Sequence, residues 1–169
     1  MKAKKTALYI TQAAAVAALY FIINLLQNTL LPGTTSMAIQ FRLAEALCVL
    51  ALFTTAAIPG LGIGCLLFNL TMAGSLPLDF IVGTAATVLA TFLMYLLRNV
   101  KIKKYPWLSM LMPVVCNAVI VGWELTYYFG TPLLLNMLYV AIGEAAVIFV
   151  LGSALYFVLE RHKTHLFAK

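Results

Sequence analysis

Five ionisable residues lie within or at the edge of apolar stretches of this sequence, and they are the side chains best able to do chemistry. They are Arg42, Glu45, Asp79, Glu124 and Glu144. A charged side chain costs about 2.5–3.5 kcal/mol at the centre of a bilayer on insertion scales, so residues of this kind mark functional sites. Carboxylates accept charge-assisted hydrogen bonds from N–H groups and cations. No nucleophile and base with suitable spacing accompany them, so the sequence predicts ligand binding rather than catalysis.

The composition requires a lipid environment for the elements that position these residues. Hydrophobic residues make up 64% of the 169 residues and charged residues only 9%, against about 25% charged in an ordinary soluble domain. Several apolar runs approach or exceed the length of about 20 residues that crosses a bilayer. We therefore predict an all-α integral membrane protein, a single transmembrane domain over residues 1–169 with about six helices. The expected helices cover residues 7–31, 37–58, 61–74, 78–97, 107–129 and 133–159.

Lysine and arginine form three clusters that predict the orientation in the membrane. They precede residue 7, lie between residues 98 and 104, and follow residue 160. With six crossings these clusters fall on one side, which the positive-inside rule identifies as the cytoplasm. Both termini are therefore expected in the cytoplasm. The net charge of +6 is explained by a basic rim against anionic lipid headgroups, so no nucleic-acid partner is predicted.

Acidic and amide side chains gather toward the outer face on this topology. The inner half of the expected spans has no acid, which argues against a proton relay and predicts a pocket open to the outside. Asn117, Glu124 and Tyr128 are seven and four residues apart, so they share one face of the fifth helix. Asn69 and Asn136 are expected near the same outer pocket.

Arg42 and Glu45 allow two interpretations. They are three residues apart in the second expected helix, so they either form an internal salt bridge or face a ligand. We expect Arg42 to hold Glu45 in place. For Glu124 and Glu144 the sequence offers no nearby cation other than Arg42, which favours a role facing the ligand.

Aromatic and alanine residues also leave alternatives open. Trp123 and Tyr128 either stack on a ligand or belong to the aromatic belt at the membrane interface. The first helix has two small-xxx-small pairs, which let another helix approach closely in lipid. These pairs are Ala13 with Ala17 and Ala14 with Ala18. They serve either packing within the chain or docking of a partner membrane protein.

Motifs for several other chemistries are absent from the sequence. It has no GxxxxGK[ST] loop, no GxSxG and no HExxH. The three cysteines fall inside expected spans without CxxC spacing, and both histidines lie in the basic tail. We therefore predict no metal, no cofactor, no structural disulfide and no enzymatic activity, and no ATP hydrolysis by this chain alone.

Four stretches of the sequence combine polar or acidic residues with apolar neighbours. They are residues 40–47 (QFRLAEAL), 77–84 (PLDFIVGT), 122–130 (GWELTYYFG) and 141–146 (AIGEAA). These stretches resemble those of the QueT family of membrane transport proteins. The resemblance extends over nearly the whole chain. Its motifs fall on four expected helices, which makes it more specific than a shared hydropathy profile.

The resemblance implies a fold, a mechanism and partners. QueT-type proteins are S components of energy-coupling factor (ECF) importers, six-helix proteins that capture a vitamin-like compound at the outer side of the bacterial cell membrane. The alanine-rich face of the first helix would dock on a transmembrane coupling subunit, which two cytoplasmic ATPases drive. As our own hypothesis, we further expect the outer segments 32–36 and 74–77 to close over the bound substrate.

The substrates that the resemblance implies are queuosine precursors, either queuine or an earlier 7-deazaguanine base. Glu124 and Glu144 would accept the N–H groups of the guanine-like edge and of an amine substituent. The side chains expected at the site are Glu124, Glu144, Asn117, Asn136, Asp79, Asn69, Trp123, Tyr128, Glu45 and Arg42. Two alternatives remain: an S component for thiamine or riboflavin, and a membrane assembly subunit that binds no ligand.

Overall fold

The computed structural model describes residues 2–35, 40–71 and 78–166. Its elements are α1 (Lys2–Leu30), η1 (Leu43–Leu52), α2 (Ala57–Thr71), α3 (Asp79–Leu97), α4 (Trp107–Phe129), α5 (Leu133–Ala146), η2 (Val147–Gly152) and α6 (Ser153–Leu166). Within the described ranges, four helical stretches are long and apolar enough to cross a bilayer. They are Ala3–Leu30, Asp79–Leu97, Trp107–Phe129 and Leu133–Lys163. The prediction of an all-α membrane protein is confirmed.

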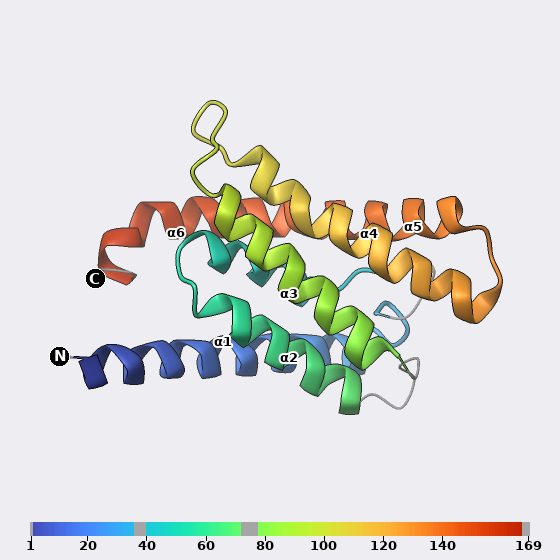
Figure 1. Cartoon of the computed structure of the whole chain (residues 1–169), viewed down its shortest axis with the longest axis horizontal. Coiled ribbons are helices and arrows are strands. Elements are labelled where there is room, and N and C mark those ends of the chain that lie inside the picture. Colours follow the sequence, from blue (N-terminus) through green and yellow to red (C-terminus); the bar gives the residue numbers. More distant parts are fainter. Residues whose placement is uncertain (1, 36–39, 72–77, 167–169) are drawn as a thin grey trace.

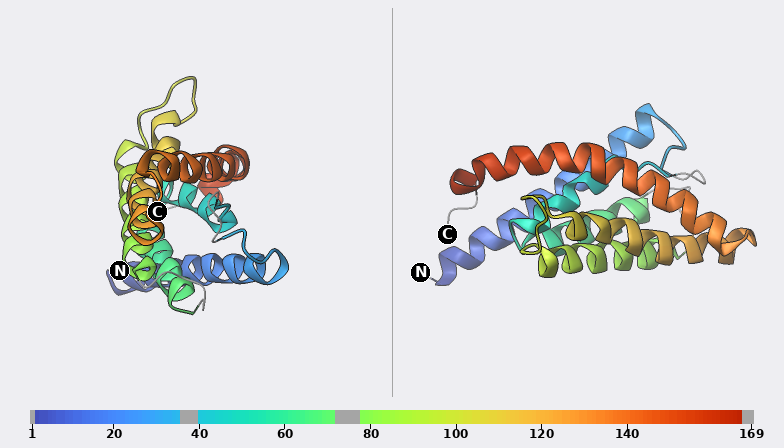
Figure 2. Two further views of the ribbon diagram at one scale, coloured as in Figure 1. Left: turned by 90° about the vertical axis from the view of Figure 1, so that its right-hand side faces the viewer. Right: turned by 90° about the horizontal axis from the view of Figure 1, so that it is seen from above.

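The helices run side by side, and each of the first five packs on its neighbour in sequence. The first turn of α1 and the last turn of α6 lie at one end of the bundle, and the α4–α5 connection lies at the other (Figure 1). Seen end on, α1 and the α5–α6 helix form two arms, with η1 between them (Figure 2). Because η1 contacts α1, α2, α3, α4, α6 and η2, this short helix joins the parts of the bundle.

The membrane span expected over residues 37–58 is wrong. The described part of this region contains a 3-10 helix of 10 residues, Leu43–Leu52, and the start of α2. At about 2.0 Å per residue, such a helix covers about 20 Å, which is too short for a hydrocarbon core of about 30 Å. Its small side chains Ala44, Cys48 and Ala51 are fully buried. The segment is apolar because protein surrounds it, and hydropathy does not distinguish that setting from lipid.

α2 begins before Pro59, whereas one helix was expected to end at residue 58 and the next to begin at residue 61. Proline is tolerated in the first turn of a helix because the N–H group it lacks would have no intrahelical partner there. α2 therefore starts at Ala57 and continues to Thr71. The expected end of this helix at residue 74 and the segment 74–77 lie outside the described residues, as does residue 36.

Glycines on α2 let α1 approach it closely. A Cβ atom at Gly60 would lie 2.6 Å from the carbonyl oxygen of Ala13, and one at Gly64 would lie 2.8 Å from that of Ala17. Ala13 and Ala17 are buried in this contact. One of the two predicted alanine pairs therefore serves packing within the chain. The other pair, Ala14 and Ala18, is exposed.

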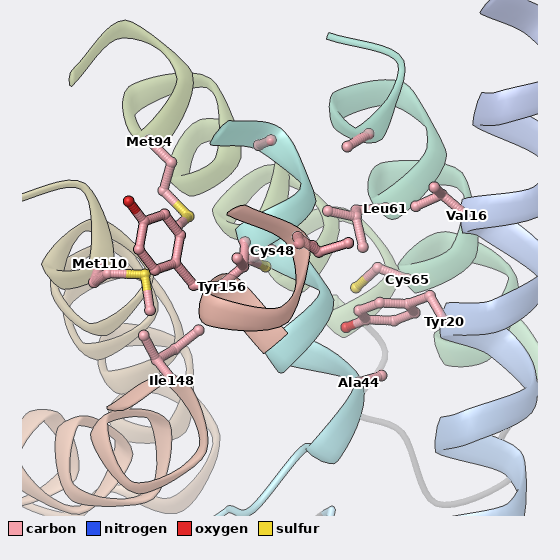
Figure 3. Close-up of a cluster of buried hydrophobic side chains, with 14 residues drawn as sticks. Val16, Tyr20, Ala44, Cys48, Leu61, Cys65, Met94, Met110, Ile148 and Tyr156 are labelled. Carbon is pink, nitrogen blue, oxygen red and sulfur yellow. The ribbon is translucent and has the colours of Figure 1, made fainter. Parts of the chain in front are cut away.

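The hydrophobic core surrounds η1 (Figure 3). Cys48 of η1 has Leu61 and Cys65 of α2 on one side and Met110 and Ile148 on the other. The α5–α6 helix passes this core through the π-helical segment η2, Val147–Gly152. Single π-helical turns in α-helices are frequent at functional sites. η2 begins three residues after Glu144, the acidic residue of α5.

Candidate functional site

A narrow cleft lies where the chain before η1 meets α4 and α5. Its lining residues are Gln40, Arg42, Glu45, Asn117, Val121, Val140 and Glu144, and we call it the polar cleft. Five of these seven side chains are polar. The free volume of the cleft is about 10 Å³, which is about the space that one water molecule needs. At 1.5 Å per helical residue, Glu144 lies roughly 17 Å from the start of α5, about halfway through a bilayer core.

Arg42 pairs with Asp79. Its Nη2 atom lies 3.2 Å from Oδ2 of Asp79, and both side chains are about a tenth exposed. Arg42 is the residue directly before η1 and has an extended backbone, with φ −92° and ψ 95°. Among the described residues the ion pair of Arg42 is with Asp79, so the expected Arg42–Glu45 salt bridge does not form. Asn69 supports the pair from α2, because its amide donates to the backbone carbonyl of Asp79 at 3.0 Å.

Glu45 is held by other partners. The Tyr20 hydroxyl donates a hydrogen bond to Oε1 of Glu45 at 2.5 Å, and the Cys48 thiol donates to Oε2 at 3.1 Å. Both side chains that donate are fully buried. Glu45 thus lines the polar cleft with each of its oxygens already engaged.

Gln27 of α1 holds the extended chain that carries Arg42. Its amide donates to the backbone carbonyl of Phe41, and its carbonyl oxygen accepts the backbone N–H of Leu43 at 2.8 Å. Backbone groups outside regular structure need such partners when they are buried. One side chain therefore sets the position of both residues next to Arg42.

Gly143 of α5 lets the same extended chain approach from the opposite side. A Cβ atom at this position would overlap the backbone carbonyl of Gln40. Because Gly143 directly precedes Glu144, this contact brings Glu144 next to the residues before η1. A side chain at position 143 would push the two walls of the polar cleft apart.

Three buried carboxylates, those of Asp79, Glu124 and Glu144, each keep one oxygen without a hydrogen-bond partner among the described residues. Glu144 is 6% exposed and lines the polar cleft, and its Oε1 is unpaired. Asn117 contacts the Glu144 side chain. Glu124 is 1% exposed with Oε1 unpaired. It follows Val121 of the cleft by one turn and lies within electrostatic reach of Arg42.

Trp123 and Tyr128 do not line the polar cleft. Trp123 is 52% exposed, and its ring stacks on that of Tyr127 at 5.9 Å between centroids. Tyr128 is partly exposed and contacts Tyr127 edge to face. These positions match the interpretation of an aromatic belt at the membrane interface.

Asn136 joins two helices in the structure. Its amide donates to the hydroxyl of Thr126 at 2.9 Å and to that of Thr131 at 2.8 Å. Thr131 in turn donates to the Asn136 carbonyl oxygen at 3.1 Å. These bonds hold the α4–α5 connection and leave Asn136 away from the cleft.

Tyr20 and Gln40 were not predicted as site residues, although the sequence contains a signal for Tyr20. Ala17, Tyr20, Asn24 and Gln27 follow one another at intervals of three and four residues, which places them on one face of α1. All four are buried. Asn24 is fully buried, and neither atom of its amide has a partner among the described residues.

The charges around the polar cleft favour a ligand that donates hydrogen bonds. Arg42 is the only basic residue between positions 6 and 97, and Asp79 neutralises it. The carboxylates of Glu45, Glu124 and Glu144 remain without a cationic partner in the described part of the chain. The described residues contain no group of three or more His, Cys, Asp or Glu side chains arranged to hold a metal ion.

The fold and this site define a class: a multi-pass α-helical membrane protein with a polar cleft enclosed by its helices. The family model described as QueT transporter matches residues 10–161. The chain therefore belongs to the QueT transporter family, and it is a transport protein of the membrane rather than an enzyme. Comparisons with curated proteins and with solved structures gave no significant match.

Proposed function

We propose that the chain is the substrate-binding S component of an ECF importer in the bacterial cell membrane, and that it binds a queuosine precursor in the polar cleft. The observation that carries the proposal is the unpaired carboxylate oxygen of Glu144, which is buried at the cleft beside Asn117. An acid at mid-membrane depth without a cation is costly, and a ligand that donates hydrogen bonds would offset that cost.

A 7-deazaguanine base has the hydrogen-bond donors that the carboxylates of this site lack. Its guanine-like edge presents adjacent N–H donors, which a carboxylate accepts in paired, charge-assisted bonds. Glu144 and Glu124 each have a free oxygen for this purpose, and Asn117 adds both a donor and an acceptor. A precursor with an amine substituent would place its positive charge among Glu45, Glu124 and Glu144.

Entry of such a ligand requires the walls of the polar cleft to separate, because the cleft now has room for about one water molecule. The chain before η1 is the wall with the least regular structure. It is held by Gln27 and by the Arg42–Asp79 pair, so movement of this segment would widen the cleft. The loaded protein would then reorient on a coupling subunit, and two cytoplasmic ATPases would supply the energy.

The first test is a thermal-shift titration of the purified protein in detergent. The panel is queuine, 7-aminomethyl-7-deazaguanine, 7-cyano-7-deazaguanine, thiamine and riboflavin. A ligand that binds only the folded state adds about 2.7 kcal/mol of stability at a hundredfold excess over its Kd. We expect stabilisation by a deazaguanine alone. Stabilisation by thiamine or riboflavin would replace the proposed substrate, and no shift with any compound would support a subunit without a ligand.

Glu144→Gln tests the site itself. The exchange keeps the shape of the side chain and removes its charge, and hydrogen bonds to a charged group contribute about 1.5–3 kcal/mol. We expect the Kd for the stabilising base to rise by at least tenfold, and a similar rise for Glu124→Gln. Glu160→Gln is the matched control, because Glu160 is partly exposed and pairs with Lys163 at 2.8 Å. Equal affinity in Glu144→Gln and Glu160→Gln would remove Glu144 from the site.

A further inference from the structure

A second cavity opens on the side of the bundle, and none of its lining residues lines the polar cleft. It has a volume of about 430 Å³ and is lined by Ile102, Lys103, Tyr105, Trp107, Phe149, Ser153 and Phe157. We call it the aromatic groove. Its volume is within the range of about 300–1,000 Å³ that is typical of small-molecule sites. Four of its seven residues are aromatic and one is basic.

The groove is formed by a hairpin that projects sideways from the bundle between α3 and α4 (Figure 1, Figure 2). Ile102 and Tyr105 exchange two backbone hydrogen bonds of 3.0 Å. The two residues between them, Lys103 and Lys104, have φ values of 50° and 68°. A two-residue turn with both central φ values positive favours Asn and Gly. The chain instead has two lysines there, in a backbone conformation that L side chains rarely adopt.

The hairpin is fixed to α6, so the groove exists before any ligand enters. The Tyr156 hydroxyl donates to the backbone carbonyl of Lys104 at 3.2 Å, and the Tyr105 and Ser153 hydroxyls are hydrogen-bonded to each other. Lys101 lies 3.6 Å from Glu160. In the part of the chain that the structure describes, the ammonium groups of Lys103 and Lys104 form no ion pair.

Depth in the membrane indicates what can reach the groove. α4 runs from Trp107 to Phe129 over 23 residues, and at 1.5 Å per residue it covers about 34 Å. A hydrocarbon core is about 30 Å thick, so Trp107 lies at its boundary. This boundary is on the side of the basic clusters. A hydrocarbon core centred on α4 would place the aromatic wall at the level of the first acyl carbons and the lysines at the level of the phosphates.

We infer that the aromatic groove is a binding site for an anionic phospholipid of the same leaflet. An acyl chain would lie along Trp107, Phe149 and Phe157, and Lys103 at the turn would pair with the phosphate. The combination of an apolar wall and free ammonium groups at one level matches a lipid with a negative headgroup. A zwitterionic lipid would lie along the same aromatic side chains, but its headgroup has no net negative charge to pair with Lys103. The inference is independent of the substrate proposed for the polar cleft.

Trp107 provides a direct probe, because the chain has only two tryptophans. In a Trp123→Phe background, Trp107 fluorescence reports contact with acyl chains. The protein is reconstituted in phosphatidylcholine vesicles that contain an increasing fraction of brominated phosphatidylglycerol or, in parallel, brominated phosphatidylcholine. We expect half-maximal quenching at a roughly fivefold lower fraction of the anionic lipid, the effect of about one lysine near a charged surface.

Charge variants separate a site from general attraction to a basic surface. Lys103→Gln with Lys104→Gln should abolish the preference of Trp107 for the anionic lipid. Lys4→Gln with Lys5→Gln removes the same charge from the start of α1 and should leave the preference intact. Trp123, probed in a Trp107→Phe background, should show no preference. Equal quenching by both lipids in the parent, or equal loss of preference in both lysine pairs, would overturn the inference.

Discussion

At the scale of single residues, the burial of Arg42 makes the fold depend on Asp79. Removing one partner of a buried ion pair leaves the other charge uncompensated and costs about 3–5 kcal/mol. We therefore expect Asp79→Asn to lower the free energy of unfolding by this amount in detergent. Glu160→Gln breaks the partly exposed ion pairs of Glu160 with Lys163 and Lys101, and such pairs contribute about 0–1 kcal/mol each. Chemical denaturation of both variants measures the difference.

A double variant tests whether the charge or the contact is responsible. Replacing both partners of a buried ion pair by apolar residues is often close to neutral. Arg42→Met combined with Asp79→Leu should therefore be more stable than Asp79→Asn alone. If the double variant is the less stable protein, packing around the two side chains accounts for the effect, and the charge pairing does not.

The ionisable residues could be located from the sequence, but their partners could not. Arg42, Glu45 and Asp79 stand out because their neighbours are apolar. The pairing of Arg42 with Asp79 depends on an extended backbone at Arg42, and the rule of i,i+3 contacts applies only within a helix. The surroundings of Trp123 could not be predicted from the sequence either. Its place on a helix face follows from spacing, but whether that face meets protein or lipid depends on the packing of α4.

At the scale of elements, the approach of α5 to the chain before η1 determines the geometry of the polar cleft. Gly143→Ala would place a methyl group against the backbone carbonyl of Gln40. Overpacking of this kind costs about 1–3 kcal/mol. Because the displaced chain carries Arg42, we expect Gly143→Ala to lower the melting temperature and to weaken binding of the stabilising base by at least about tenfold.

Gly152→Ala is the control for this prediction, since it is the same exchange on the same helical stretch. Its added Cβ would lie 3.2 Å from a methyl group of Val49, and a side chain can shift more easily than a backbone carbonyl. Binding should change little in this variant. If Gly152→Ala weakens binding as much as Gly143→Ala, a general disturbance of the helix is responsible, and contact with the cleft wall is not.

The long helices could be predicted from hydropathy, whereas η1 could not. α3 and α4 match the expected ranges closely because lipid surrounds one face of each, so their apolar length reflects the membrane thickness. η1 is enclosed by other helices, and its ten residues are apolar for a different reason. Pro59 was misleading for the same kind of reason, since a proline is compatible with both the end and the first turn of a helix.

At the scale of the whole molecule, the two alanine pairs of α1 face different surroundings. Ala13 and Ala17 are buried against α2, and Ala14 and Ala18 are exposed. Leucine at positions 13 and 17 would overpack the contact with Gly60 and Gly64, at a cost of about 1–3 kcal/mol for each. We expect Ala13→Leu with Ala17→Leu to lower the melting temperature of the isolated protein.

Leucine at positions 14 and 18 should act on assembly instead. These positions would meet a coupling subunit in the proposed importer, where small residues allow close contact between helices. We expect Ala14→Leu with Ala18→Leu to keep the melting temperature and the affinity for the base, and to lose co-purification with the coupling subunit and uptake by cells. Because folding and binding are measured in the same variant, loss of uptake has one remaining cause. Normal co-purification and uptake would show that this face of α1 meets lipid, and the docking surface would then have to lie on another helix.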